Sequence, residues 1–118
     1  MAAKIILKAN HTVIPAILND TVAAKDFKKR LPLTISGHRS EFDYCCTAAS
    51  GLFDPSETQS GWKNGDISLA GGWFAVLFDG EEHSSEYRGV MVIAHINEEN
   101  LDLVRNLPSS VHFTVELA

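Results

Sequence analysis

The sequence predicts a mainly β fold, a closed barrel of about eight strands with two short helices plugging its ends. Short runs of β-branched and aromatic residues, separated by turn residues, recur along the chain. Only two segments show helical spacing. So many strands in one small domain favour closure, because a closed barrel has no unpaired edge and about eight strands leave an interior that side chains fill. At 118 residues, we expect a single domain over 1–118.

Two runs at the start of the chain predict a β-hairpin. Residues 4–10 and 12–19 are rich in β-branched residues, and the polar pair Asn10-His11 lies at their junction. Pro15 has no backbone N–H to donate, so the second strand is expected to be an edge or to bulge there. Two expectations for assembly stay open, a monomer or a weak homodimer that pairs through this edge.

A change of period after this hairpin predicts a helix of about ten residues. Polar residues can cap its start, and Pro32 ends it, because the residue before a proline disfavours the helical conformation. The candidate caps are Asn19, Asp20 and Thr21. The face toward the core is expected to carry Ala23, Phe27 and either Arg30 or Leu31.

Residues 32–36 and 41–47 are predicted to be strands around a loop at 37–40. Alternation in the second strand places two sets of side chains on opposite faces. One set is Phe42, Tyr44 and Cys46, and the other is Glu41, Asp43 and Cys45. Residues 48–65 then show no period and contain many Gly, Pro and Ser residues. Long loops of this kind are often functional.

The pair Gly71-Gly72 is predicted to be a hairpin corner rather than a phosphate-binding loop. It separates strands predicted at 66–70 and 73–79, and a two-residue turn requires the positive φ that glycine adopts freely. A phosphate loop would place its glycines before a helix, whereas the residues after this pair are aromatic and β-branched. Alternation directs Trp73 outward and the other aromatic positions of its strand, Phe74 and Phe78, inward.

The last third of the chain predicts a loop at 79–89, a strand at 89–96 covered on both faces, a second helix and a closing strand at 111–118. Asn97 is the candidate cap of the helix, and Pro108 ends it. Helical spacing is shown by Leu101, Val104 and Leu107.

Composition and charge argue against several classes of function. The formal net charge is −5, and the one basic cluster, Lys28 to Arg30, suits the end of a helix, so nucleic acid is not an expected partner. No apolar run reaches the roughly 18 residues of a membrane span. The five histidines are spread over different elements, so neither a metal nor another cofactor is expected.

The two cysteines, Cys45 and Cys46, are adjacent, so a disulfide between them would be strained. Free thiols suit a reducing compartment, which favours the cytoplasm. Either thiol could act as a nucleophile, but the carboxylates Glu41 and Asp43 on the same strand would raise the pKa of a thiol. A structural role is therefore favoured for both.

Several strings, in their order along the chain, resemble the cyclophilin-like barrel family, in particular its small prokaryotic branch. These strings are "LNDTVAAKDFKKRLPLTI", "EFDYC", "GWKNGDI", "FAVLFDG" and "GVMVIAHI". The resemblance spans nearly the whole chain and implies the barrel fold. It also implies peptidyl-prolyl isomerase as one possible activity, since true cyclophilins catalyse that reaction.

The chain departs from cyclophilins at the positions that matter for this chemistry. Cyclophilins carry a catalytic arginine in an F-H-R string on the strand that "EFDYCC" resembles, and no arginine lies there. Their active-site histidine and tryptophan fall on Val90 and Ser85. The resemblance thus implies the scaffold without its catalytic groups, unless Arg39 or Arg88 supplies a relocated arginine.

We therefore expect a barrel that binds a peptide or a small molecule in an outer groove, without classical isomerase chemistry. The groove would lie between the strand at 41–45, Trp73 and the loop at 81–88. An outward tryptophan beside carboxylates could hold a peptide or a cation. The alternative is that the 48–65 loop or Trp62 simply covers Trp73. The candidate ligand-binding residues are Glu41, Asp43, Cys45, Trp73, His83 and Ser84.

Overall fold

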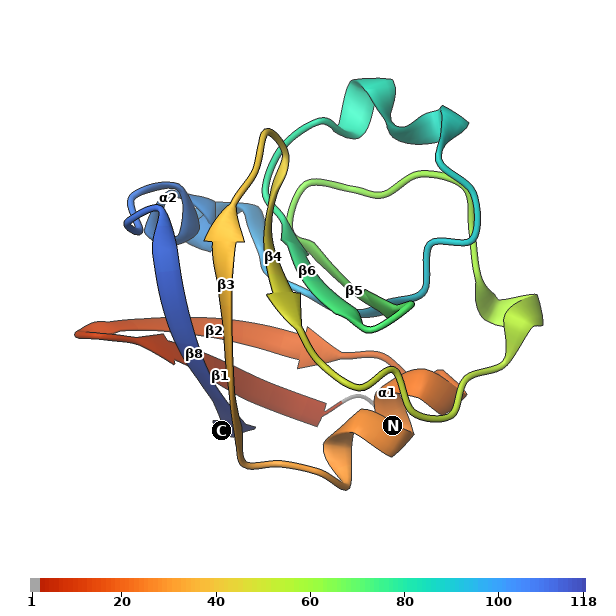
Figure 1. The fold of residues 1–118 in the computed structure, drawn as a ribbon, viewed down its shortest axis with the longest axis horizontal. Helices are drawn as coiled ribbons and strands as arrows, with labels where there is room; N and C mark the ends of the chain where they lie inside the picture. The colour runs from red at the N-terminus through yellow and green to blue at the C-terminus, as the bar shows by residue number, and fades with distance from the viewer. Residues whose placement is uncertain (1–2) are drawn as a thin grey trace.

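The computed structural model describes residues 3–118 and confirms the closed, mainly β barrel (Figure 1). The antiparallel strands follow one another in the order β1-β2-β7-β5-β6-β4-β3-β8, and β8 pairs with β1 to close the ring. The strands are β1 Ala3–Ala9, β2 Thr12–Leu18, β3 Leu33–Arg39, β4 Asp43–Thr47, β5 Asp66–Ala70, β6 Trp73–Leu77, β7 Val92–His95 and β8 Ser110–Leu117.

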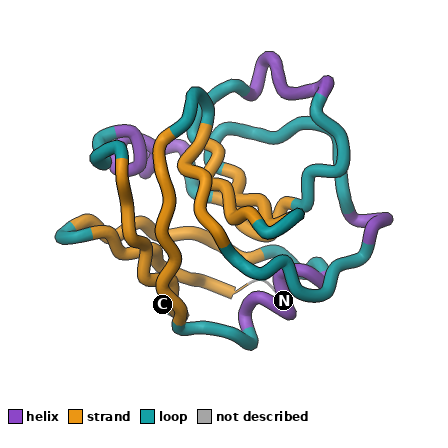
Figure 2. The backbone as a smooth tube through the Cα atoms, viewed as in Figure 1, coloured by secondary structure: helices purple, strands orange, loops and turns teal. Residues whose placement is uncertain are grey.

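Two short α-helices add apolar side chains to the core from different sides of the barrel (Figure 1). Helix α1 covers Val22–Lys28 and helix α2 covers Leu101–Arg105. Phe27 of α1 is fully buried, and its ring stacks on Phe74 with centroids 5.5 Å apart. Three 3₁₀ turns lie in the connections and share the helix colour in Figure 2. They are η1 Pro55–Glu57, η2 Glu81–Glu86 and η3 Glu98–Asn100.

The predicted helix cap and hairpin corners are confirmed. Thr21 caps α1, because its hydroxyl oxygen accepts the Ala24 N–H at 3.1 Å. Asn10 has a φ of 56° in the first hairpin turn. Gly71 and Gly72, at φ 61° and 85°, form the two-residue turn between β5 and β6.

Strand β3 is longer than predicted, because residues 37–39 belong to the strand rather than to a loop. Gly37 pairs with Cys46 on one side and with Val111 on the other, so the strand has a partner on each edge. A Cβ at this glycine would collide with the backbone carbonyl of Cys45. Glycine at 37 therefore allows two strands to approach closely, and a turn is not its role here.

Phe42 lies outside the core, contrary to its predicted inward face. Strand β4 begins at Asp43, and the carbonyl of Phe42 accepts two backbone N–H groups, from Phe78 at 3.0 Å and Asp79 at 3.3 Å. This irregular pairing takes Phe42 out of the alternation. Its neighbours Tyr44 and Cys46 are fully buried, as predicted.

The α2 end of the barrel is closed by contacts from the buried Tyr44 and from Arg39. The Tyr44 hydroxyl lies 2.8 Å from the carbonyl oxygen of Leu107 and 2.9 Å from that of Pro108. The Arg39 guanidinium stacks 4.8 Å from the Phe78 ring centroid and donates to the Arg105 carbonyl at 2.7 Å. These contacts hold the chain that follows α2 against the strands.

Strand β2 is not an edge strand, because it pairs with β1 on one side and with β7 on the other. Pro15 is tolerated because, within residues 3–118, the pairing with β7 involves Ile17 and Leu18 and does not reach Pro15. On its other side Pro15 lies opposite Ile6 of β1. Within residues 3–118, no helix is long and apolar enough to cross a membrane.

Candidate functional site

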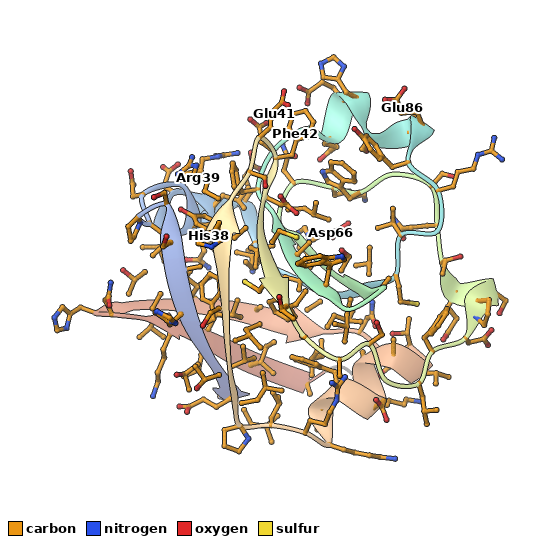
Figure 3. All side chains as sticks on the ribbon, in the orientation of Figure 1. His38, Arg39, Glu41, Phe42, Asp66 and Glu86 are labelled. Atoms are coloured by element: carbon orange, nitrogen blue, oxygen red, sulfur yellow. The ribbon has the colours of Figure 1, made fainter. Side chains whose placement is uncertain are left out.

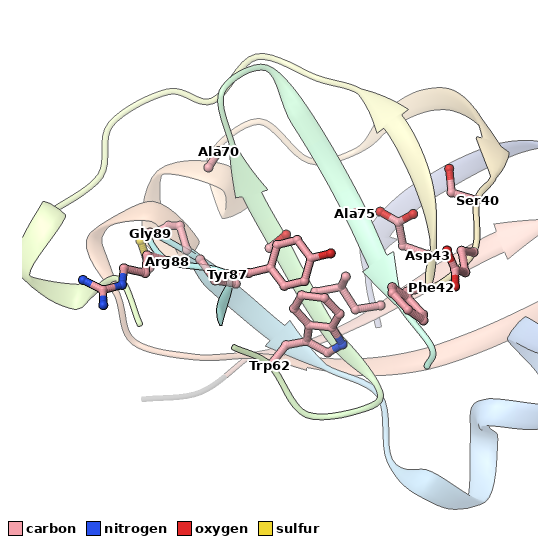
Figure 4. A pocket seen from close by; sticks show the side chains of 14 residues that line it. Ser40, Phe42, Asp43, Trp62, Ala70, Ala75, Tyr87, Arg88 and Gly89 are labelled. Atoms are coloured by element: carbon pink, nitrogen blue, oxygen red, sulfur yellow. The ribbon is translucent and has the colours of Figure 1, made fainter. Parts of the chain in front are cut away.

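A groove of about 380 Å³ lies on the outer face of strands β4, β5 and β6 (Figure 4). We call it the outer groove. Its floor consists of outward side chains of these strands, Asp43, Ser68, Ala75 and Leu77. Its sides are the β3–β4 turn, Trp62 and the segment 87–91.

Two floor positions on β6 that would normally face water carry apolar side chains. In β6 the inward residues Phe74 and Val76 fill the core, as alternation predicts. The outward Ala75 and Leu77 are nevertheless only 8% and 6% exposed. They are covered by Trp62, with which they form a second hydrophobic cluster outside the barrel. A cluster of this kind on an outer sheet face gives the groove its apolar surface.

Trp62 is held in place by the buried hydroxyl of Ser84. The Ser84 oxygen accepts the Trp62 backbone N–H at 3.0 Å and lies 2.8 Å from the carbonyl of Glu81. The indole N–H of Trp62 donates to the carbonyl of Asp79 at 2.9 Å. Ser84 was predicted to bind a ligand, but it is only 3% exposed and its hydroxyl is occupied by these bonds. It positions the groove wall instead.

Further bonds join the two loops on either side of Trp62. Asn64 and Glu81 exchange reciprocal bonds of 2.8 and 3.1 Å between backbone N–H groups and side-chain oxygens. The Gly61 N–H donates to the Tyr87 carbonyl at 2.8 Å. Gln59 and Val90 form an isolated antiparallel bridge. The long 48–65 loop is thus fixed to the segment after β6 at several points.

Aromatic rings form a continuous wall along the groove. The ring centroids of Trp62 and Tyr87 are 5.3 Å apart, and those of Phe42 and Trp62 are 6.2 Å apart. Tyr87 lines the groove and is 46% exposed, so part of the residue is accessible from solvent. Sequence reasoning missed Phe42 and Tyr87 as wall residues, and it gave Trp62 only a covering role.

Two carboxylates and one arginine complete the lining of the groove. Burial raises the pKa of Asp43, and no hydrogen bond or ion pair to its carboxylate is found within residues 3–118. Glu41 is exposed at the β3–β4 turn, beside Phe42 (Figure 3). Arg88 is also exposed, and its guanidinium points away from Trp62 and Tyr87 (Figure 4).

Trp73 and Cys45 belong to a neighbouring surface rather than to the outer groove. Trp73 is 53% exposed and pairs with Thr47, beside the β5–β6 turn. It is therefore not covered by Trp62, which packs on Ala75 and Leu77 instead. Cys45 and Trp73 line a shallow cavity with outward side chains of β3 and β8. Two hydrogen bonds join β3 and β8 among the residues that line this cavity. They are Ser36 with His112 at 2.6 Å and His38 with Ser110 at 3.1 Å.

The remaining candidates lie away from the groove. His83 has a side chain that is 73% exposed, and its nearest charged partner is Glu82 at 3.7 Å. Arg39 faces the α2 end of the barrel. Burial raises the pKa of the Cys45 thiol, and burial with the adjacent Cys45 and Asp43 raises the pKa of Cys46 to about 12. Both sulfurs are thus poor nucleophiles at neutral pH.

Within the described part of the chain, residues 3–118, no three His, Cys, Asp or Glu side chains gather closely enough to hold a metal ion.

Comparisons with known proteins identify a matching family model and a similar solved structure. A family model described as the cyclophilin-like family matches residues 7–116. The solution structure of the hypothetical protein AF2241 from Archaeoglobus fulgidus matches with a TM-score of 0.75. The match covers 98% of this chain and 95% of that one, at 14% sequence identity, so this likeness concerns the fold alone. No curated protein matches the chain.

Proposed function

The chain belongs to the cyclophilin-like family, and from this premise we propose that its outer groove binds a peptide or a small molecule without cyclophilin-type isomerase chemistry. One observation supports this most strongly. The groove has a largely apolar lining, and the Trp62 of its aromatic wall is fixed in place by hydrogen bonds. Concave, mostly apolar sites with a few polar groups are typical of ligand binding.

The size and rigidity of the groove support binding rather than a purely structural role. A volume of about 380 Å³ lies within the range of roughly 300–1,000 Å³ usual for small-ligand sites. A wall that is already ordered loses little conformational entropy when a ligand binds. An outer sheet face that served only stability would more simply carry polar side chains at Ala75 and Leu77.

The arginine positions support binding without isomerisation. Rotation about an X–Pro bond has a barrier of roughly 20 kcal/mol, which an arginine lowers only if it can donate to the twisting amide. Arg39 is engaged with Phe78 and the Arg105 carbonyl, away from the groove. Arg88 lines the rim of the groove, with its guanidinium pointing away from the aromatic wall.

The groove can be tested with tryptophan as the reporter, since the chain has only two tryptophans. In a Trp73→Phe variant, all indole signal comes from Trp62 in the groove wall. We expect a binding peptide or metabolite from a screen to change Trp62 fluorescence and the indole N–H chemical shift. We expect Tyr87→Ala to weaken that binding by about fivefold or more, because it removes an aromatic contact face.

Phe53→Ala is the matched control, because Phe53 is 46% exposed, like Tyr87, but does not line the groove. It should leave affinity unchanged. A ligand that changes the indole N–H chemical shift of Trp73 in the wild-type chain, but not that of Trp62, would refute the groove assignment. Proline isomerisation in a protease-coupled assay, abolished by Arg88→Ala, would contradict the absence of isomerase chemistry.

A further inference from the structure

We propose that the ligand of the outer groove is a peptide with a basic side chain, lysine or arginine, whose charged end binds the carboxylate of Asp43. This inference rests on the proposed function, because it names the chemical class of ligand for the same groove. It is supported by the environment of Asp43, by the aromatic wall and by the distribution of charge around the groove.

Asp43 presents an unpaired carboxylate on the groove floor. It is the first residue of β4 and lies opposite the apolar Leu77 of β6. Its backbone carbonyl accepts the Ser40 N–H at 2.7 Å, whereas its side chain has no hydrogen-bond or ionic partner within residues 3–118. A partly buried carboxylate without a partner gains most from a cation that also donates hydrogen bonds.

The aromatic wall leads to this carboxylate and favours a long side chain. Phe42 directly precedes Asp43, and its ring contacts Trp62, which in turn contacts Tyr87. Lysine and arginine pack their methylene stems on apolar surfaces while their charged ends reach a polar group. The faces of aromatic rings also attract cations. A compact ammonium ion could use the carboxylate but would leave most of the wall empty.

The charges around the groove favour a cationic ligand as well. Glu41 adds a second negative charge at the same end, on the β3–β4 turn. Arg88 is the one cationic side chain among the described residues that line the groove. Its guanidinium points away from the aromatic wall, so it does not neutralise Asp43 (Figure 4).

The test compares two peptides that differ only in charge. One is acetyl-Gly-Gly-Lys-Gly-Gly-amide, and the other has norleucine in place of lysine, which keeps the four-carbon stem without the ammonium group. Each is titrated into the Trp73→Phe variant, with Trp62 as the reporter. We expect the lysine peptide to bind about tenfold more tightly, because it adds one charge-assisted hydrogen bond.

The Asp43→Asn variant should remove this preference and leave the affinity for the norleucine peptide unchanged, which also shows that the groove remains folded. Glu86→Gln is the matched control, because Glu86 is exposed on η2 and does not line the groove. It removes the same charge and should retain the tenfold preference.

The outcomes separate this inference from the function on which it rests. Equal affinity for the two peptides would overturn the basic-ligand inference and leave the binding groove standing. No change at Trp62 with either peptide, or with any compound of the screen, would overturn both. Binding of n-butylammonium as tight as that of the lysine peptide would overturn the assignment to a peptide and indicate a free amine.

Discussion

At the scale of single residues, Asp43 lowers the stability of the fold at a position where it can contribute to binding. Its carboxylate is half-buried beside apolar side chains, and burial raises its pKa. A group with a raised pKa in the folded state holds its proton more tightly when folded than when unfolded. Ionised Asp43 therefore costs stability at neutral pH, and this cost shrinks as the pH falls below its folded pKa and is gone below the unfolded value.

Asp43→Asn should consequently stabilise the free protein at pH 7. Because the side chain is partly exposed, solvent screens much of the effect, and we expect the melting temperature to rise by only about 1–3 °C. The difference should shrink toward pH 4, where the wild-type carboxyl is increasingly protonated. Thermal unfolding of both chains across this pH range measures it, and a variant less stable than wild type at pH 7 would contradict it.

The residues of the site could be predicted from the sequence only in part. Alternation along one strand correctly placed Asp43 on the outer side, because strand periodicity is a local property. Glu41 is exposed too, but it lies on the turn before the strand and not in the predicted strand. Alternation could not place Phe42, whose irregular pairing depends on Phe78, far along the chain. The role of the Ser84 hydroxyl in holding Trp62 could not be predicted either, because the two residues are 22 positions apart in the sequence.

At the scale of elements, the outer groove depends on the contact between the loop that carries Trp62 and the 3₁₀ turn η2. Neither segment has regular strand pairing, apart from the bridge between Gln59 and Val90. Their mutual position rests on the Ser84 hydroxyl, the Asn64–Glu81 pair and the indole N–H of Trp62. Sequence patterns predict strands and caps well, but a contact between two irregular segments has no period to reveal it.

Ser84→Ala tests this contact. Loss of the hydroxyl leaves the buried Trp62 N–H without an acceptor, which costs about 1–3 kcal/mol. We expect the free energy of unfolding to fall by that amount and the Trp62 amide to exchange its hydrogen faster.

Ser85→Ala provides the comparison, because Ser85 is the exposed neighbour on the same turn. It should behave like the wild type in both measurements. Equal amide protection of Trp62 in the two variants would show that Ser84 does not hold the wall.

At the scale of the whole molecule, the barrel could be predicted from local sequence features. Hairpin turns at Asn10 and at Gly71-Gly72, a threonine cap and inward aromatic residues all agree with one closed architecture. The error at residues 37–39 arose because glycine in a sequence suggests a turn, whereas Gly37 serves close packing between strands. Only the pairing of β3 with both β4 and β8 distinguishes the two roles.

Gly37→Ala should therefore destabilise the whole barrel, because the added methyl group would meet backbone atoms that cannot rotate away. We expect a loss of about 2 kcal/mol or more in urea unfolding. Gly89→Ala is the matched comparison, since a Cβ there meets nothing within 4 Å and adds only the strain of a φ of 72°. That strain costs about 1 kcal/mol. A smaller loss at 37 than at 89 would contradict the close approach of the strands.

The ring is sealed by its last strand, since β8 lies between β1 and β3. During synthesis β8 is made after the other seven strands of residues 3–118. Until then, the edges of β1 and β3 that pair with β8 have no partner. Exposed flanks of this kind recruit strands from other chains. Chains that stop before Ser110 should accordingly aggregate or bind chaperones. Chains that include the eight residues of β8 should do neither.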